Sequence, residues 1–107
     1  MIKLCYKNFV LGQLNYDSLT KEYVYNSNLE NEKRAKEKYS ELDFYYLTNS
    51  VNRRSKKLFK DFIIFMQSAS RKDIVSLAGI EKEDSEFEIL QKIASINMID
   101  DSFYITL

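Results

Sequence analysis

The spacing of apolar residues changes along this chain, from every second residue near the N-terminus to every third or fourth residue beyond position 57. Ile2, Leu4 and Tyr6 alternate with other residues, which is the period of a strand with one buried face. The run that begins at Leu58 has helical spacing instead. Strands followed by helices and a final β-like segment predict an α+β domain, with a small antiparallel sheet packed against three C-terminal helices.

Three strands are expected in the first 26 residues. After the first strand, Lys7 and Asn8 form a plausible turn, because asparagine tolerates the left-handed backbone of tight hairpins. Residues 9–16 return as a second strand, in which Gly12 indicates a bulge or a close backbone approach. Residues 22–25 form a short third strand rich in β-formers. Sequential strands of this kind favour an antiparallel meander.

The charged stretch at residues 29–41 leaves two alternatives open. Opposite charges four residues apart, such as Glu30 and Arg34, would support a helix on its surface. The apolar stripe of this stretch is thin, so a solvated helix and a mobile excursion fit equally well. Alternating apolar residues then predict a fourth strand over 41–47.

Three helices are expected after a polar connection. The first begins near Ser55, and the second begins at Ser70, which opens a Ser-x-x-Asp pattern typical of a helix N-terminus. Gly79 stands where a C-terminal cap is expected, and the third helix begins near Asp84. Since no Pro- or Gly-rich linker divides the chain, residues 1–107 are predicted to form a single domain.

Composition argues against several classes of site. The chain has no histidine and one cysteine, Cys5, so the commonest general base and every thiolate-rich metal site are missing. Its two glycines, Gly12 and Gly79, are 67 positions apart, which excludes a glycine-rich phosphate loop. Acidic clusters at residues 81–84 and 100–101 are interpreted as solvated caps rather than as metal ligands. We therefore expect no enzymatic activity, no catalytic residue, no metal and no cofactor.

A soluble cytoplasmic protein is expected. The single cysteine cannot form an internal disulfide, and the longest apolar cluster, residues 62–66, is too short to span a bilayer. The net charge is zero but uneven, since residues 1–72 carry 14 basic and 8 acidic side chains and residues 73–107 carry 2 and 8. Either this dipolar chain docks electrostatically on a partner, or its two parts cancel after folding.

Several segments resemble the small N-terminal subdomain of HipA-type kinases. Its second strand carries G-x-L and its third ends in F-x-Y, which residues 12–14 (G-Q-L) and 23–25 (Y-V-Y) resemble. The aromatic run at 58–66 looks like the helix that follows there, and Arg71 matches an arginine of the next helix. Residues 84–93 resemble the D-x-F-x-L-L-x-x-I helix of that family. The resemblance covers most of the chain, and the charged stretch after the third strand is its clearest exception.

The kinase core that follows this subdomain in HipA is absent from this sequence, so the chain resembles the HipS-like antitoxins of HipBST toxin–antitoxin systems. The resemblance implies an antitoxin that binds and neutralises a separate HipA/HipT-like Ser/Thr kinase toxin by protein–protein contact. It also implies a HipB-like DNA-binding protein as the third component of a ternary complex. No reaction and no membrane contact are implied for the antitoxin itself.

The end of the aromatic helix is the first candidate partner-binding site. The run that starts at Phe62 has more consecutive apolar residues than one helical face can bury. Phe65, Met66 and Gln67 are therefore the candidates to project from this end and to enter the kinase cleft. Most of the other aromatic residues are expected in the core or on the sheet.

Basic residues form the second candidate site. Arg53, Arg54 and Lys57 belong to a positive segment that pairs with an acidic kinase surface or with nucleic-acid phosphates, or else forms a solvated helix start. Arg71 is either an interface cation or the partner of an acidic neighbour such as Asp73, and we favour the ion pair.

A small nucleic-acid-binding module is the alternative function. Basic residues beside Tyr6, Tyr16, Tyr23 and Tyr25 on a small sheet would stack exposed bases. The zero net charge argues against this alternative, since dedicated nucleic-acid binders are usually basic. We therefore expect no direct contact with nucleic acid.

Overall fold

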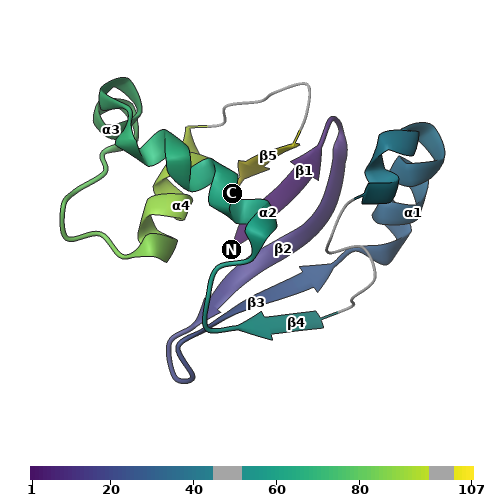
Figure 1. The fold of residues 1–107 in the computed structure, drawn as a ribbon, viewed down its shortest axis with the longest axis horizontal. Helices are drawn as coiled ribbons and strands as arrows, with labels where there is room; N and C mark the ends of the chain where they lie inside the picture. Colours follow the sequence, from purple (N-terminus) through teal and green to yellow (C-terminus); the bar gives the residue numbers. More distant parts are fainter. Residues whose placement is uncertain (45–51, 97–102) are drawn as a thin grey trace.

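A computed structural model describes residues 1–44, 52–96 and 103–107 of the chain. Five strands form one antiparallel sheet in the order β4-β3-β2-β1-β5, which confirms the predicted α+β class, the N-terminal meander and the C-terminal strand (Figure 1). The strands are β1 (Ile2–Tyr6), β2 (Phe9–Asp17), β3 (Glu22–Ser27), β4 (Asn52–Ser55) and β5 (Phe103–Thr106). The α-helices are α1 (Leu29–Lys38), α2 (Lys60–Met66), α3 (Lys72–Ala78) and α4 (Glu86–Ser95), and the 3-10 helices are η1 (Ser40–Phe44) and η2 (Gln67–Ser70).

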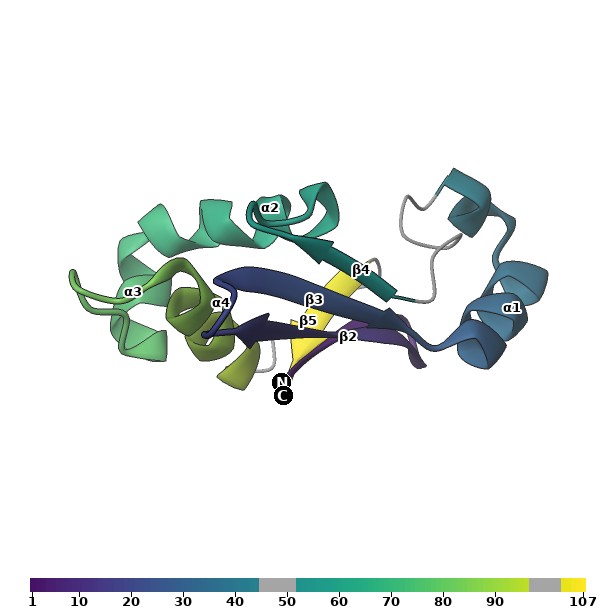
Figure 2. The same cartoon turned by 90° about the horizontal axis from the view of Figure 1, so that it is seen from below.

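The helices occupy distinct places around the sheet. Helix α2 lies across one face, while α3 and α4 gather at one end of the molecule and α1 lies at the other (Figure 2). The core forms where these helices meet the sheet: Tyr25 of β3, Phe62 of α2 and Leu90 of α4 are fully buried. The two halves of the chain are therefore joined through one hydrophobic core.

Gly12 lies at an irregular point of the sheet. The register of β1 against β2 shifts by one residue beside it, which leaves Leu11 as the extra residue of a β-bulge. A Cβ atom at Gly12 would overlap the ring of Tyr25 and approach the Asn26 carbonyl oxygen to 2.7 Å. The structure therefore confirms both predictions for Gly12, a β-bulge and a close approach of the neighbouring strand.

The fourth strand differs from the prediction. Residues 40–44 form the 3-10 helix η1, in which Leu42 is buried, and residues 45–47 of the predicted strand lie outside the described part. The fourth strand is instead β4, at the edge of the sheet, and α2 begins at Lys60 rather than near Ser55. A short edge strand takes its hydrogen bonds from its neighbour and needs no apolar alternation, so the pattern did not reveal it.

The charged stretch after β3 adopts a helix, α1, which resolves the two alternatives. Asn28 caps its N-terminus by accepting a hydrogen bond from the Asn31 backbone N–H at 3.1 Å. The expected ion pair between Glu30 and Arg34 is present at 2.7 Å on the exposed side. Charge pairing and a cap thus support the surface of a helix that has few buried residues.

Two helix starts differ from the prediction by one residue. Arg71 rather than Ser70 occupies the N-cap of α3, and the Ser70 hydroxyl donates to a backbone carbonyl instead. Ser85 rather than Asp84 caps α4. The predicted cap at the end of α3 is confirmed, because Gly79 has a left-handed φ of 72°.

Glu32 is the buried carboxyl of α1, and its replacement is expected to stabilise the protein. The side chain is 3% exposed, and its Oε1 has no hydrogen-bond partner in the described part of the chain. Burial raises the pKa of Glu32, so the folded state holds this proton more tightly than the unfolded state. The stability that this provides is full at acid pH and is lost as the pH rises through the folded-state pKa. We expect Glu32→Gln to raise the free energy of unfolding by about 1 kcal/mol at neutral pH.

Urea denaturation across a range of pH values checks this expectation. The gain from Glu32→Gln should shrink below the ordinary glutamate pKa, where the wild-type carboxyl is also neutral. Glu37→Gln is the matched control, because Glu37 lies on the same helix and is exposed. A Glu32→Gln variant that is less stable than the wild type at neutral pH would contradict the expectation that burying the ionised Glu32 carboxyl destabilises the protein.

Candidate partner-binding surface

Helix α2 has one face in the core and one face in solvent. Phe62 is 0% exposed, and its ring lies 5.9 Å from the ring of Tyr25 in the sheet below. On the outside, Ile63 and Ile64 are 47% and 62% exposed. The exposed residues at helical spacing on this side are Lys60, Ile63, Ile64 and Gln67, which we call the outer α2 stripe.

The three candidates at the end of the aromatic run are placed differently from one another. Phe65 and Met66 are half-buried and pack against the core, while Gln67 is exposed. Positions three and four residues after Phe62 lie on the same helical face as Phe62, which explains why both side chains turn inward. The apolar surplus of this run is therefore exposed at Ile63 and Ile64 rather than at Phe65 and Met66.

The basic residues before α2 are exposed. Arg53 and Lys57, together with Lys56, form what we call the basic segment. Arg53 pairs with Tyr25 across the sheet, so it lies on the face that α2 covers, and its guanidinium lies 6.0 Å from the ring centre of Phe59. None of these three cations forms an ion pair with a carboxylate in the described ranges. Arg53 interacts electrostatically with the half-buried Asp61 carboxyl in the first turn of α2, so the positive charge without a carboxylate partner in the described ranges lies at Lys56 and Lys57.

Arg54 is engaged inside the molecule. Its guanidinium binds Asp17 at 2.7 Å and Glu22 at 3.3 Å, which fastens the edge strand β4 to the β2–β3 turn. This guanidinium also lowers the pKa of the Asp17 carboxyl. Both Arg54 and Arg53 lie on a strand, so they are not part of the helix start that the sequence suggested. These contacts give Arg54 a structural role in the free protein.

Arg71 forms the ion pair with Asp73 that the sequence analysis favoured. Its guanidinium lies 2.9 Å from the Asp73 carboxylate, and both side chains are exposed. The hydrogen bond from Arg71 lowers the pKa of Asp73. Exposed pairs of this kind are weak, so Arg71 remains accessible to a partner.

The aromatic platform of the nucleic-acid alternative is covered. Tyr6, Tyr23 and Tyr25 are all buried, and their rings have no free face for a base. Tyr16 is 38% exposed, but it packs against Tyr23 at 5.1 Å and against Phe87 at 5.9 Å between ring centres. These four tyrosines therefore do not form the open aromatic platform that stacking of single-stranded bases requires.

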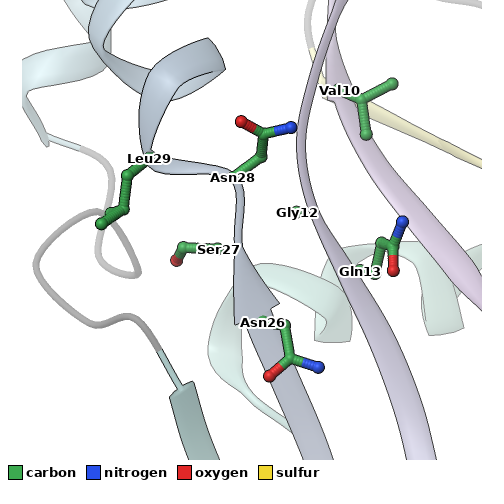
Figure 3. A pocket seen from close by; sticks show the side chains of 7 residues that line it. All are labelled: Val10, Gly12, Gln13, Asn26, Ser27, Asn28 and Leu29. Atoms are coloured by element: carbon green, nitrogen blue, oxygen red, sulfur yellow. The ribbon is translucent and has the colours of Figure 1, made fainter.

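An open pocket of about 430 Å³ lies between β2 and the end of β3, beside the start of α1 (Figure 3). Its lining residues are Val10, Gly12, Gln13, Asn26, Ser27, Asn28 and Leu29. The polar side chains of this lining are neutral amides and a hydroxyl, which supply hydrogen bonds but no general acid or base. Sequence reasoning did not find this pocket, because three separate elements form it.

Asp84, in the first acidic cluster, has a structural role. The Asp84 carboxylate accepts a hydrogen bond from the Glu81 backbone N–H at 2.8 Å and pairs with Lys92 at 2.6 Å. These contacts lower the pKa of Asp84. In the described part of the chain, no group of three or more Cys, Asp or Glu side chains is placed to hold a metal ion. Residues 100–101 of the second acidic cluster lie outside that part.

Comparisons with protein-family models, with curated proteins and with solved structures found no match to this chain. The resemblance to HipA-type kinases therefore depends on the sequence motifs alone. No helix within the described ranges is long and apolar enough to cross a membrane. The features that the structure offers for function are the exposed side of α2, the basic segment and the pocket.

Proposed function

We propose that this chain is an antitoxin that binds and neutralises a separate HipA/HipT-like Ser/Thr kinase toxin by protein–protein contact. The observation that carries the proposal is the exposed isoleucine pair on α2, which lies within the aromatic run that resembles the HipA subdomain. Exposed apolar residues grouped on one helix face are typical of interaction sites. The proposed activity needs no catalytic group, metal or cofactor in this chain.

The proposed complex also includes a HipB-like DNA-binding protein, as the sequence resemblance implies. Within it, the end of α2 with Gln67 is the part of this chain proposed to approach the kinase cleft. Gln67 supports this role, since it is exposed at the junction of α2 and η2. Phe65 and Met66 reach a partner only if they leave their contacts with the core.

We predict that Phe65→Ala and Met66→Ala act mainly on stability. Each side chain packs against the core, so each truncation should lower the free energy of unfolding by about 2 kcal/mol. Thermal unfolding of the isolated protein measures this loss, and titration with the kinase measures binding at a temperature where both variants are folded. Wild-type stability combined with lost kinase binding would instead make them interface residues.

Co-expression tests the proposed function in cells. The proposal predicts that a reading frame beside this chain's gene encodes a HipA-like kinase. That kinase should arrest growth when expressed alone, and this chain should restore growth and co-purify with the kinase. No rescue and no complex would contradict the proposal. Binding of the isolated chain to single-stranded RNA at low salt would favour the nucleic-acid alternative, and we expect none.

A further inference from the structure

The basic segment directly precedes α2, and the outer side of α2 exposes Ile63 and Ile64. We propose that the outer α2 stripe and the basic segment form one docking surface, and that its partner is an apolar patch bordered by carboxylates on the kinase. This inference rests on the proposed function and adds to it the chemistry of the partner's surface. It also assigns binding to residues other than the inward-facing Phe65 and Met66.

The apolar half of the surface is not required by the fold. Ile63 and Ile64 follow the fully buried Phe62 directly, yet about half or more of each side chain remains exposed. Exposing two branched aliphatic side chains side by side on a seven-residue helix brings no packing gain to the free protein. Covering them with a partner removes this apolar surface from water and favours association.

The basic residues of the proposed surface indicate that the partner's surface is negatively charged. Lys60 begins α2 and adds positive charge at the helix end that is itself positive, and the basic segment lies just before it. Elsewhere in the described chain, Arg34, Arg54, Arg71 and Lys92 each pair with a carboxylate. Lys56, Lys57 and Lys60 form no ion pair in the described ranges, as is true of other lysines such as Lys33, and the nearby Asp61 carboxyl interacts with Arg53. Because these three lysines lie within five residues, carboxylates on a partner would relieve the repulsion among them.

A protein fits this surface better than the two other macromolecules that basic residues attract. Stacking of single-stranded bases requires exposed aromatic faces, whereas the exposed apolar side chains of the outer α2 stripe are aliphatic. Helices that bind membrane surfaces bury a long apolar face, whereas α2 has seven residues and exposes two isoleucines. Aliphatic side chains flanked by cations match an apolar protein patch with an acidic border.

Calorimetric titration of the neighbouring HipA-like kinase with purified variants tests the inference. Ile63→Ser/Ile64→Ser should weaken binding about 30-fold, because two apolar contacts are lost. Lys56→Glu/Lys57→Glu should weaken it about tenfold at roughly 50 mM salt, and the loss should shrink at about 300 mM. The matched controls are Leu77→Ser on α3, where the leucine is 69% exposed, and Lys33→Glu on α1. Both controls should bind as the wild type does.

The outcomes separate this inference from the proposed function. If the wild-type chain does not bind the kinase, the proposed function fails and the inference fails with it. If the wild type binds and both α2-side variants bind equally well, the function stands and this surface is wrong. Anionic phosphatidylglycerol vesicles serve as a second probe: vesicle binding that is lost in Ile63→Ser/Ile64→Ser, with kinase binding unchanged, would overturn the inference in favour of a membrane.

Discussion

Gly12→Ala is expected to lower the free energy of unfolding by about 3 kcal/mol, which is a large part of the 5–15 kcal/mol that stabilises a typical domain. The new Cβ would overlap the Tyr25 ring and approach the Asn26 carbonyl oxygen to 2.7 Å. Tyr25 is fully buried between the sheet and α2, so its ring cannot move aside into solvent. Urea denaturation followed by circular dichroism measures the loss.

Two further variants separate this collision from the ordinary cost of replacing a glycine. Gly79→Ala meets no atom within 4 Å and is strained only by its φ of 72°, so we expect a smaller loss of about 1 kcal/mol. Combining Gly12→Ala with Tyr25→Leu shortens the colliding side chain. The double variant should therefore lose less stability than the sum of the losses measured for the two single variants. If the losses of the two single variants add up in the double variant, or if Gly12→Ala is as stable as the wild type, Tyr25 does not pack tightly against Gly12.

Phe62→Ala is expected to lower the free energy of unfolding by about 4 kcal/mol. Phe62 is fully buried, and its ring packs against Tyr25 at 5.9 Å and Phe65 at 6.5 Å between ring centres. Removing the ring leaves a cavity between α2 and the sheet, and the lost contacts also loosen α2. Chemical denaturation of the isolated protein provides the measurement.

Ile63→Ala is the matched control for this core position. It removes an aliphatic side chain from the next residue of the same helix, at a site that is 47% exposed. We expect a loss below about 1 kcal/mol, since exposed sites contribute little. Equal losses at the two positions would mean that α2 is rotated relative to the sheet, and the outer α2 stripe would then not exist in solution.

Much of the fold follows from local patterns in the sequence. The alternation of Ile2, Leu4 and Tyr6 identified β1, and Gly12 marked the bulge in β2. Features decided by tertiary contact were missed. In the hairpin turn, Lys7 rather than Asn8 takes the positive φ, at 51°. Side-chain preference is a weak guide where the strand register fixes the turn.

The edge strand β4 shows why the remaining elements could not be predicted. Its sequence, Asn52-Arg53-Arg54-Ser55, has no apolar residue, and its pairing depends on β3. Conversely, the alternating residues after Glu41 predicted a strand, whereas the 3-10 helix η1 buries Leu42 without one. An apolar alternation of a few residues satisfies more than one local structure, and packing selects among them.

The sequence predicted which segment holds the candidate site, but not which of its side chains face outward. The sequence showed that residues 62–66 hold more apolar side chains than one helical face can bury. Which of them face outward depends on how α2 rotates against Tyr25, and the burial of Phe62 sets that rotation. The same dependence on tertiary structure separates Arg54, which forms an ion pair with Asp17, from Arg53, which forms no ion pair within the described ranges. Spacing alone treats the two arginines as equivalent.

Neutralisation is measured by a phosphorylation assay with the purified HipA-like kinase that the proposed function predicts as the partner of this chain. Autophosphorylation is followed with labelled ATP while this chain is added up to a molar excess. Kinase activity should fall as a stable complex forms, and Ile63→Ser/Ile64→Ser should shift the inhibition to higher concentrations of this chain. Full kinase activity in the presence of excess chain, with no complex by size-exclusion chromatography, would contradict the proposed function.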